Sequence, residues 1–306
     1  MSNLHEQNKK KNFIFFGTDD FSVNVLSELK ESGFIPKILV TAPDRPAGRG
    51  QKIQKPVAKI WAENLKGGGI EILQPEKLNN DFVLKISNQE WDFFVTASYG
   101  KIISQKVLDI PKNGAFNVHP SLLPLYRGAS PVESAILNDN RETGVTIIMM
   151  DEKMDHGPII SQEVVYFKEW PTKIEVEEKL AKVGGVLLSQ TINPYLDGEI
   201  EEQDQEHEVA TFTKKITKEM GQIEFSDLEK SLSDEKLARE IFIKIQSLNP
   251  WPGVFFFFKN ENKKIRVKIK SASWNEESET KLKINMVLPE GKKEMSYEDF
   301  IRGYLK

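Results

Sequence analysis

The chain of 306 residues contains no cysteine. Disulfide bonds, thiolate metal sites, iron–sulfur clusters and a cysteine nucleophile are therefore excluded, and a reducing, cytoplasmic setting is the simplest expectation. Histidine is scarce as well: the four imidazoles stand at positions 5, 119, 156 and 207, without a metal-ligand spacing such as His-Glu-x-x-His. We therefore expect no bound metal.

Long apolar runs are also missing. No stretch approaches the roughly 20 apolar residues that cross a bilayer, so we expect no membrane partner. Residues 1–11 are polar and lack the apolar segment of a signal peptide, which predicts a short disordered lead-in. The net charge is -4, but residues 208–306 carry 19 Lys and Arg against 16 Asp and Glu. Any contact with a polyanion should therefore favour the C-terminal third.

The first two thirds alternate between apolar runs and segments with helical spacing. The expected strands lie at 13–16, 38–41, 70–73, 92–96, 115–118, 143–150 and 159–166, and the expected helices at 21–29, 57–65, 81–87 and 174–192. This alternation predicts an α/β fold with a Rossmann-like, mostly parallel sheet. The turn after the first strand lacks both the Gly-x-Gly-x-x-Gly fingerprint and a Walker loop, so bound NAD or ATP is not expected.

A different composition follows the acidic segment 193–211. A helix at 235–246 precedes strand-like runs at 254–258, 263–274 and 281–288, which suggests a small all-β domain, an OB-like β-barrel. We therefore divide the chain into the lead-in 1–11, a first domain 12–195, a linker 196–211 and a barrel 212–306. The run of four phenylalanines at 255–258 is expected to be a buried strand, and Trp251 is expected in the barrel core.

The densest cluster of reactive groups is the run 117–128, Asn-Val-His-Pro-Ser-Leu-Leu-Pro-Leu-Tyr-Arg-Gly. Asn117 and His119 are two residues apart, so a strand would point both side chains to one side. Two prolines then predict a stiff, exposed turn. Asp155 follows a strand in a glycine-containing loop and can reach the same sheet edge. An amide, an imidazole and a carboxylate together suit attack of an amine on a carbonyl without a covalent enzyme intermediate.

These residues resemble the folate-dependent formyltransferases. The resemblance rests on the Asn-x-His-Pro-Ser-Leu-Leu-Pro motif, on Tyr126-Arg127-Gly128 and on Asp155-x-Gly157. Within that superfamily, the loop 41–50 (Thr-Ala-Pro-Asp-Arg-Pro-Ala-Gly-Arg-Gly), the triplet 144–146 and the segment 249–253 (Asn-Pro-Trp-Pro-Gly) are similar to the methionyl-tRNA formyltransferases. The similarity extends from about residue 13 onward.

The resemblance implies transfer of a formyl group from 10-formyltetrahydrofolate, a co-substrate, to the α-amine of methionine on charged initiator tRNA, giving N-formylmethionyl-tRNA for translation initiation. It makes 12–195 the catalytic domain and 212–306 the tRNA-binding domain. We expect a monomer. The implied site residues comprise the catalytic Asn117, His119 and Asp155, the folate-binding Ser121, Leu122, Leu123 and Pro124, and the tRNA-binding Arg45, Arg49, Lys52, Lys264, Arg266 and Lys268.

Several alternatives stay open at this stage. A sugar-nucleotide or glycinamide ribonucleotide formyltransferase would share the Asn-x-His-Pro motif but would not explain the arginine loop, and a non-catalytic RNA-binding protein on the same fold would not need the catalytic trio. Tyr126 and Arg127 either brace the loop or contact a ligand. His156, beside Asp155, departs from the family pattern and predicts an additional titration in a pH profile.

Overall fold

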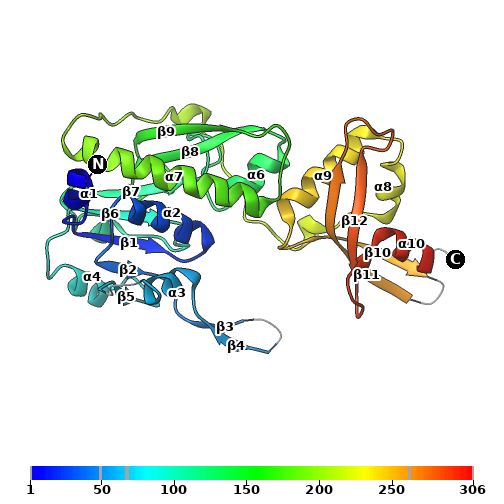
Figure 1. Ribbon diagram of the computed structural model, residues 1–306, viewed down its shortest axis with the longest axis horizontal. Helices are drawn as coiled ribbons and strands as arrows, with labels where there is room; N and C mark the ends of the chain where they lie inside the picture. Colours follow the sequence, from blue (N-terminus) through cyan, green and yellow to red (C-terminus); the bar gives the residue numbers. More distant parts are fainter. Residues whose placement is uncertain (1, 48–49, 66–68, 261–262, 305–306) are drawn as a thin grey trace. The chain divides into compact units, whose positions relative to one another are not determined.

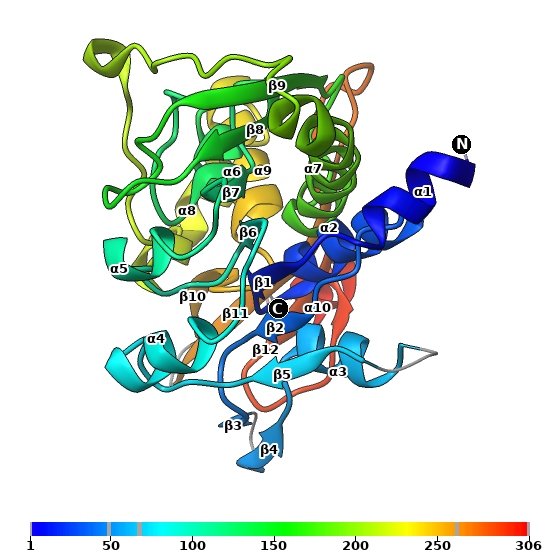
Figure 2. The same ribbon diagram turned by 90° about the vertical axis from the view of Figure 1, so that its left-hand side faces the viewer.

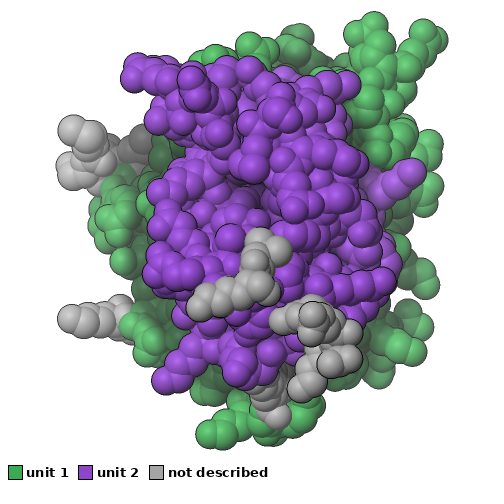
Figure 3. Space-filling view, turned by 90° about the vertical axis from the view of Figure 1, so that its right-hand side faces the viewer, with its two compact units in different colours: residues 1–128, 142–166, 177–212 green, residues 129–141, 167–176, 213–306 purple. Residues whose placement is uncertain are grey.

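The computed structural model describes residues 2–47, 50–65, 69–260 and 263–304. It divides into two compact units, each assembled from three stretches of the chain (Figure 3). The first unit contains residues 1–128, 142–166 and 177–212, and the second contains 129–141, 167–176 and 213–306. No helix in the described parts of the chain is long and apolar enough to span a membrane.

The first unit is built on a seven-stranded sheet with the order β5-β2-β1-β6-β7-β8-β9 (Figure 1). The five strands from β5 to β7 run parallel, β8 pairs antiparallel with β7, and β9 pairs antiparallel with β8. The predicted mostly parallel α/β fold is therefore confirmed. The strands are β1 (Phe13–Gly17), β2 (Ile38–Val40), β5 (Glu71–Leu73), β6 (Phe93–Ala97), β7 (Ala115–His119), β8 (Glu142–Met149) and β9 (Ile159–Tyr166).

Helices cover both faces of this sheet. On one face, α4 and α5 pack over Phe16, Phe94 and their neighbours in a buried cluster. On the other, α7 approaches so closely that a Cβ on Gly184 would lie 2.6 Å from Val118 Cγ1, and its Gly185 lies against α2 (Figure 2). The helices of this unit are α1 (Ser2–Asn8), α2 (Asp20–Glu31), α3 (Val57–Glu63), α4 (Asn80–Ile86), α5 (Gln105–Leu108), the later part of α7 (Lys173–Leu196) and the 3-10 turn η1 (His207–Val209).

Residues 2–8 of the N-terminal lead-in form helix α1, whereas the sequence predicts disorder over 1–11. The reason lies in the buried Asn8, whose Nδ2 donates to Ser32 O at 2.8 Å and whose Oδ1 accepts from Asn193 Nδ2 at 2.7 Å. Two long-range hydrogen bonds thus hold the end of α1. Asn193 belongs to α7, which continues to Leu196, past the expected end of the first domain at 195.

The second unit combines an antiparallel sheet with several helices. Its strands pair in the order β10-β11-β12-β13, and the apolar side of α9 packs on them with Phe242 and Ile245 against Phe256 and Val267. The elements are α6 (Pro131–Leu137), the start of α7, the 3-10 turn η2 (Glu219–Gly221), α8 (Phe225–Lys230), α9 (Glu235–Leu248), β10 (Val254–Asn260), β11 (Lys263–Trp274), β12 (Leu282–Pro289), β13 (Met295–Ser296) and α10 (Tyr297–Tyr304).

The small antiparallel β domain expected after the linker is thus confirmed, but it is not all-β, because α8 and α10 complete its core. Within the described residues β10 and β13 form the two edges of the sheet, and closure into an OB-like barrel stays a prediction. Phe255, Phe256 and Phe258 are buried, as expected for a buried strand. Trp251, by contrast, is 52% exposed, so its expected place in the core is wrong.

Candidate active site

Strand β7 presents an amide and an imidazole side by side. Asn117 and His119 lie two residues apart in its last three positions, so both side chains leave the same face of the sheet, as the sequence predicts. His119 is 4% exposed and Asn117 is half-buried. The strand is fixed between β6 and β8, with Asn117 opposite Thr96 on one side and Ile148 on the other.

Asp155 brings a carboxylate to this pair from the turn after β8. Its Oδ1 accepts a hydrogen bond from Asn117 Nδ2 at 3.3 Å and lies 3.5 Å from His119 Nδ1. Its Oδ2 accepts from the Gly128 backbone N–H at 2.8 Å. Asp155 adopts the left-handed region with φ at 50°, which aims the carboxylate back at the strand. The structure therefore brings the three predicted catalytic side chains together.

The hydrogen-bond partners of His119 restrict its protons. Its Nε2 lies 3.1 Å from the carbonyl oxygen of Tyr126, and because a carbonyl only accepts, Nε2 must carry a proton. The other nitrogen, Nδ1, faces Asp155. The imidazole is thus oriented by two acceptors at opposite ends of the ring, and Nδ1 is the end that adjoins the carboxylate.

The turn after His119 is buried, which corrects the expectation of an exposed loop. Ser121 and Leu123 are 0% and 3% exposed. Ser121 Oγ donates to Leu125 O at 2.6 Å, and Thr146 Oγ1 donates to Ser121 O at 2.6 Å while accepting from Leu123 N at 3.0 Å. Gln162 Nε2 donates to both Leu123 O and Thr146 Oγ1, each at 2.8 Å. The Ser121 hydroxyl is thus occupied in holding the turn.

Arg127 is used to brace the loop. It is 3% exposed, and its Nε and Nη2 donate to Gln205 Oε1 at 3.1 and 2.6 Å. Burial lowers the pKa of Arg127, against the opposing charges of Asp155 and Asp151. Gln205 has no signal in the sequence, since it lies in the acidic segment read as a linker.

A second polar cluster lies where the strand order reverses, at the carboxyl ends of β1 and β6. Asp19 Oδ1 accepts from Ser22 N at 3.2 Å, and its Oδ2 accepts from the Ser98 hydroxyl. Ser22 Oγ in turn donates to Ala97 O at 2.7 Å. Parallel sheets bind ligands in the crevice at such a switch point, and β7 is the next strand along. The trio therefore adjoins the edge of the sheet where a ligand is expected.

Comparisons with known proteins agree with this arrangement. The family described as formyl transferase matches residues 10–192, and its C-terminal domain matches residues 215–282. The chain belongs to the formyl transferase family. A methionyl-tRNA formyltransferase of Halalkalibacterium halodurans is 36% identical over 95% of this chain and 94% of its own, and that of Bacillus subtilis is 35% identical over 95% and 94%.

Solved structures of other formyltransferases have the same fold. A 4-N formyltransferase from Francisella tularensis aligns with a TM-score of 0.61 at 20% identity, covering 86% of this chain and 98% of its own. An N-formyltransferase from Helicobacter canadensis, solved with folinic acid and dTDP-3-aminofucose, aligns with a TM-score of 0.59 at 19% identity, covering 87% and 90%. At these identities the likeness supports the formyl transferase fold alone.

In this formyl transferase, the arginine loop forms a hairpin of β3 (Arg45–Ala47) and β4 (Lys52–Gln54). Arg45 and Lys52 are exposed on it, and Arg45 Nη2 lies 3.5 Å from Glu76 Oε2. Arg49, the third predicted tRNA contact of this loop, lies outside the described residues. The hairpin therefore places two of the three predicted cations on an exposed strand pair.

The other predicted tRNA contacts of the formyl transferase alternate along β11. Lys264, Arg266 and Lys268 lie on one face of the sheet, because alternate residues of a strand share a face. Lys264 Nζ lies 4.1 Å from the ring centre of Phe257, and Arg266 Cζ lies 3.6 Å from that of Phe255. Burial and the neighbouring charges of Arg266 and Lys270 lower the pKa of Lys268. Cations and aromatic rings therefore share this face.

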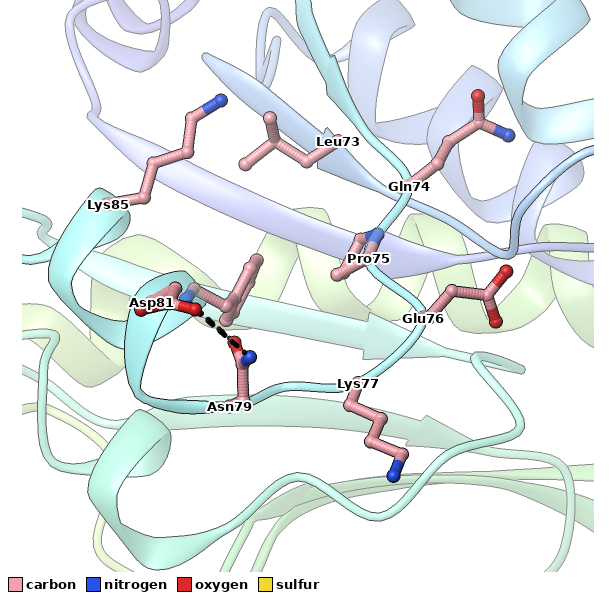
Figure 4. A pocket seen from close by; sticks show the side chains of 9 residues that line it. Leu73, Gln74, Pro75, Glu76, Lys77, Asn79, Asp81 and Lys85 are labelled. Carbon is pink, nitrogen blue, oxygen red and sulfur yellow. Dashed lines mark hydrogen bonds between the residues drawn. The ribbon is translucent and has the colours of Figure 1, made fainter.

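One groove of the formyl transferase involves none of the predicted site residues. It follows β5, has a volume of about 530 Å³, and is lined by residues such as Lys77 and Lys85, with Asn79 hydrogen-bonded to Asp81 at its rim (Figure 4). Across the described part of the chain, no cluster of three or more His, Asp or Glu side chains could hold a metal ion.

Proposed function

We propose that the chain transfers the formyl group of 10-formyltetrahydrofolate to the amine of methionyl initiator tRNA. The convergence of Asn117, His119 and Asp155 supports formyl transfer, because the three groups can bind a developing oxyanion and move a proton. The acceptor is supported by the full-length similarity to methionyl-tRNA formyltransferases at 35–36% identity.

In the proposed mechanism, the second N–H of Asn117 Nδ2 and the Nε2–H of His119, released from the Tyr126 carbonyl, donate hydrogen bonds to the formyl oxygen as the amine attacks the formyl carbon. A new N–C bond forms while the bond from that carbon to N10 of the folate breaks. Asp155 holds both donors and accepts the proton that leaves the amine, which then passes to the departing N10. Loss of one oxyanion donor costs on the order of 3 to 4 kcal/mol in the barrier.

The folate co-substrate is proposed to bind beside β7. Thr96, opposite Asn117 on β6, has a buried hydroxyl without a hydrogen-bond partner among the described residues, which fits a polar ligand at this edge. Within the predicted folate segment, Leu122 and Pro124 are half-buried, whereas Ser121 and Leu123 are buried. We propose that Leu122 and Pro124 line the site and that the other two hold the turn.

The tRNA is proposed to contact the hairpin at Arg45, Arg49 and Lys52 and the β11 face at Lys264, Arg266 and Lys268. On β11 the cations crowd one another, and phosphate groups would relieve this repulsion. The phenyl rings of Phe255 and Phe257 hold the two nearest cations in place. The first unit would then supply catalysis and the second would hold the tRNA, in a cytoplasmic monomer.

The test is formylation by the purified protein with 10-formyltetrahydrofolate and charged initiator tRNA. We expect formylmethionyl-tRNA, with free methionine and an amino-sugar nucleotide left unmodified. Equal activity on the sugar amine would overturn the tRNA assignment, and transfer to none of these amines would overturn formyl transfer itself. A His119→Ala protein prepared in the same way controls for activity from the expression host.

A further inference from the structure

The buried side chain of Gln205 connects Arg127 to the backbone of the Asp155 turn. Its Nε2 donates to Asp155 O at 3.0 Å and to Gly157 O at 2.7 Å, while its Oε1 accepts both hydrogen bonds from Arg127. The amide is 4% exposed and fully used. The backbone that carries Asp155 is therefore held by a side chain from a distant segment.

Arg127 also depends on His207. Its Nη2 lies 2.8 Å from His207 Nδ1, and since a guanidinium only donates, Nδ1 must be unprotonated. His207 stacks on His156, with ring centres 4.2 Å apart and an angle of 8° between the rings. His156 Nδ1 lies 2.6 Å from Asp151 Oδ2, and since a carboxylate only accepts, Nδ1 is the donor of this hydrogen bond. The arrangement thus requires a neutral His207 beside an imidazole paired with a carboxylate.

We propose that Gln205 and Arg127 are positioning residues for Asp155, and that the stacked pair His156 and His207 makes this support sensitive to protonation. A proton on His207 Nδ1 occupies the position at which Arg127 donates. Arg127 then loses one of its hydrogen bonds and faces a second cation. A shift of Arg127 would move Gln205, and Gln205 would in turn move the turn that directs Asp155 toward Asn117 and His119. The inference rests on the formyl transfer proposed above.

The charges around His207 give the direction of the effect. Desolvation by neighbouring groups, then the charges of His156 and Arg127, lower the pKa of the exposed His207 below the usual 6.5. Lys153 lowers it too, and Asp204 raises it. Since the pKa is lowered, the neutral form that the network needs is present at neutral pH and is lost in acid. The rate of formylation should therefore fall as the pH drops into the acid range, and part of this fall should come from protonation of His207.

The first test measures kcat and KM for formylation between pH 5 and pH 8. Gln205→Met removes both donors to the turn, and we expect kcat to fall about 100-fold with KM for tRNA and folate within about twofold. His207→Gln keeps an acceptor for Arg127 without a titrating ring, so kcat at pH 8 should stay near wild type while part of the acid limb disappears. His5→Gln is the matched histidine control.

A second measurement does not depend on activity. The chain has only four histidines, so ¹³C-histidine labelling gives four ring signals that single substitutions assign. In the wild type the His119 signal should move together with the titration of His207, and in His207→Gln that step should vanish. A His119 signal indifferent to His207, or pH profiles of His207→Gln and wild type that superimpose, overturns the inference. If the wild type shows the coupling but formylates nothing, the proposed function fails alone.

Discussion

Asp155 is the residue on which the candidate site depends most, because both of its carboxylate oxygens have partners. Asp155→Asn keeps the size of the side chain but replaces one carboxylate oxygen with an NH2 group. In either orientation this NH2 group faces another donor, because one side of the carboxylate meets the Gly128 N–H and the other meets Asn117 Nδ2. We expect formylation kcat to fall at least about 100-fold, equivalent to roughly 3 kcal/mol. The matched control is Asp109→Asn, at the residue that follows the end of α5. A kcat within threefold of wild type would contradict the proposed role.

Gly157 allows the Asp155 turn to pass close to β8. A Cβ at this position would lie 1.9 Å from the Met149 carbonyl oxygen, so Gly157→Ala must displace the turn. We expect at least a tenfold loss of kcat, since misplacement of a catalytic group by about 1 Å can cost 100-fold. Gly303→Ala is the control, because nothing lies within 4 Å of its Cβ position. Equal kinetics in the two variants would refute the packing argument.

The convergence of Asn117, His119 and Asp155 could be predicted from the sequence, whereas the groups that hold these three side chains in place could not. Asn117 and His119 share a strand face, and period-two alternation gives that directly. Asp155 accepts a hydrogen bond from the backbone N–H of Gly128, and a backbone group cannot be recognised from the side-chain pattern. Gln205 lies in a polar segment, in which a glutamine is expected to be exposed to solvent. The sequence allows Arg127 either to brace the loop or to contact a ligand, and its burial favours bracing.

At the scale of elements, long apolar patterns were predicted well, whereas several of the short helices were missed. Strands β9 and β11 have the predicted bounds, because apolar alternation marks a buried strand face. Helices α1, α5 and α10 have eight residues or fewer, and such helices depend on tertiary contacts rather than on propensity. The buried Phe300 of α10, packed in the core of the second unit, is one such contact.

The β3–β4 hairpin gives a prediction about its cations. If Lys52 and Arg45 contact phosphates, Lys52→Ala and Arg45→Ala should each raise KM for charged tRNA several-fold and reduce the slope of log affinity against log salt by about 1. The folate KM should not change. Lys85→Ala is the control, since Lys85 is an exposed lysine paired with Glu71 at 2.8 Å. Salt slopes that match wild type in both hairpin variants would remove the hairpin from tRNA binding.

At the scale of the whole molecule, the second unit includes stretches that the sequence assigns to the first domain. Residues 129–141 and 167–176 belong to it, although the predicted boundary lies at 195. One side chain of α9 accounts for much of this. Arg239 donates to Asp139 through Nε at 3.0 Å and Nη2 at 2.7 Å, and to Glu169 through Nη1 at 2.8 Å. Ion pairs between stretches so distant along the chain leave no local pattern.

The stability of this unit should therefore depend on Arg239 and on pH. Burial raises the pKa of Asp139, but the hydrogen bonds and the charge of Arg239 outweigh this effect and hold that pKa below its usual 3.8. A carboxylate with a lowered pKa contributes its stability above the unfolded-state pKa and loses it as the pH falls through the folded-state value. Arg239→Met leaves Asp139 and Glu169 without their cation and should cost about 2 kcal/mol of unfolding free energy at pH 7.

The expected pH dependence separates lost charge from lost packing, because Arg239 also lies over the rings of Phe242 and Trp274. In unfolding followed by circular dichroism, the difference between wild type and Arg239→Met should begin to shrink as the pH falls below the usual Asp pKa of 3.8, and should be lost once the pH has passed the lowered folded-state pKa of Asp139. A pH-independent difference would assign the effect to packing on those rings. Arg302→Ala, which breaks an exposed pair with Asp299, should cost less than about 0.5 kcal/mol at either pH.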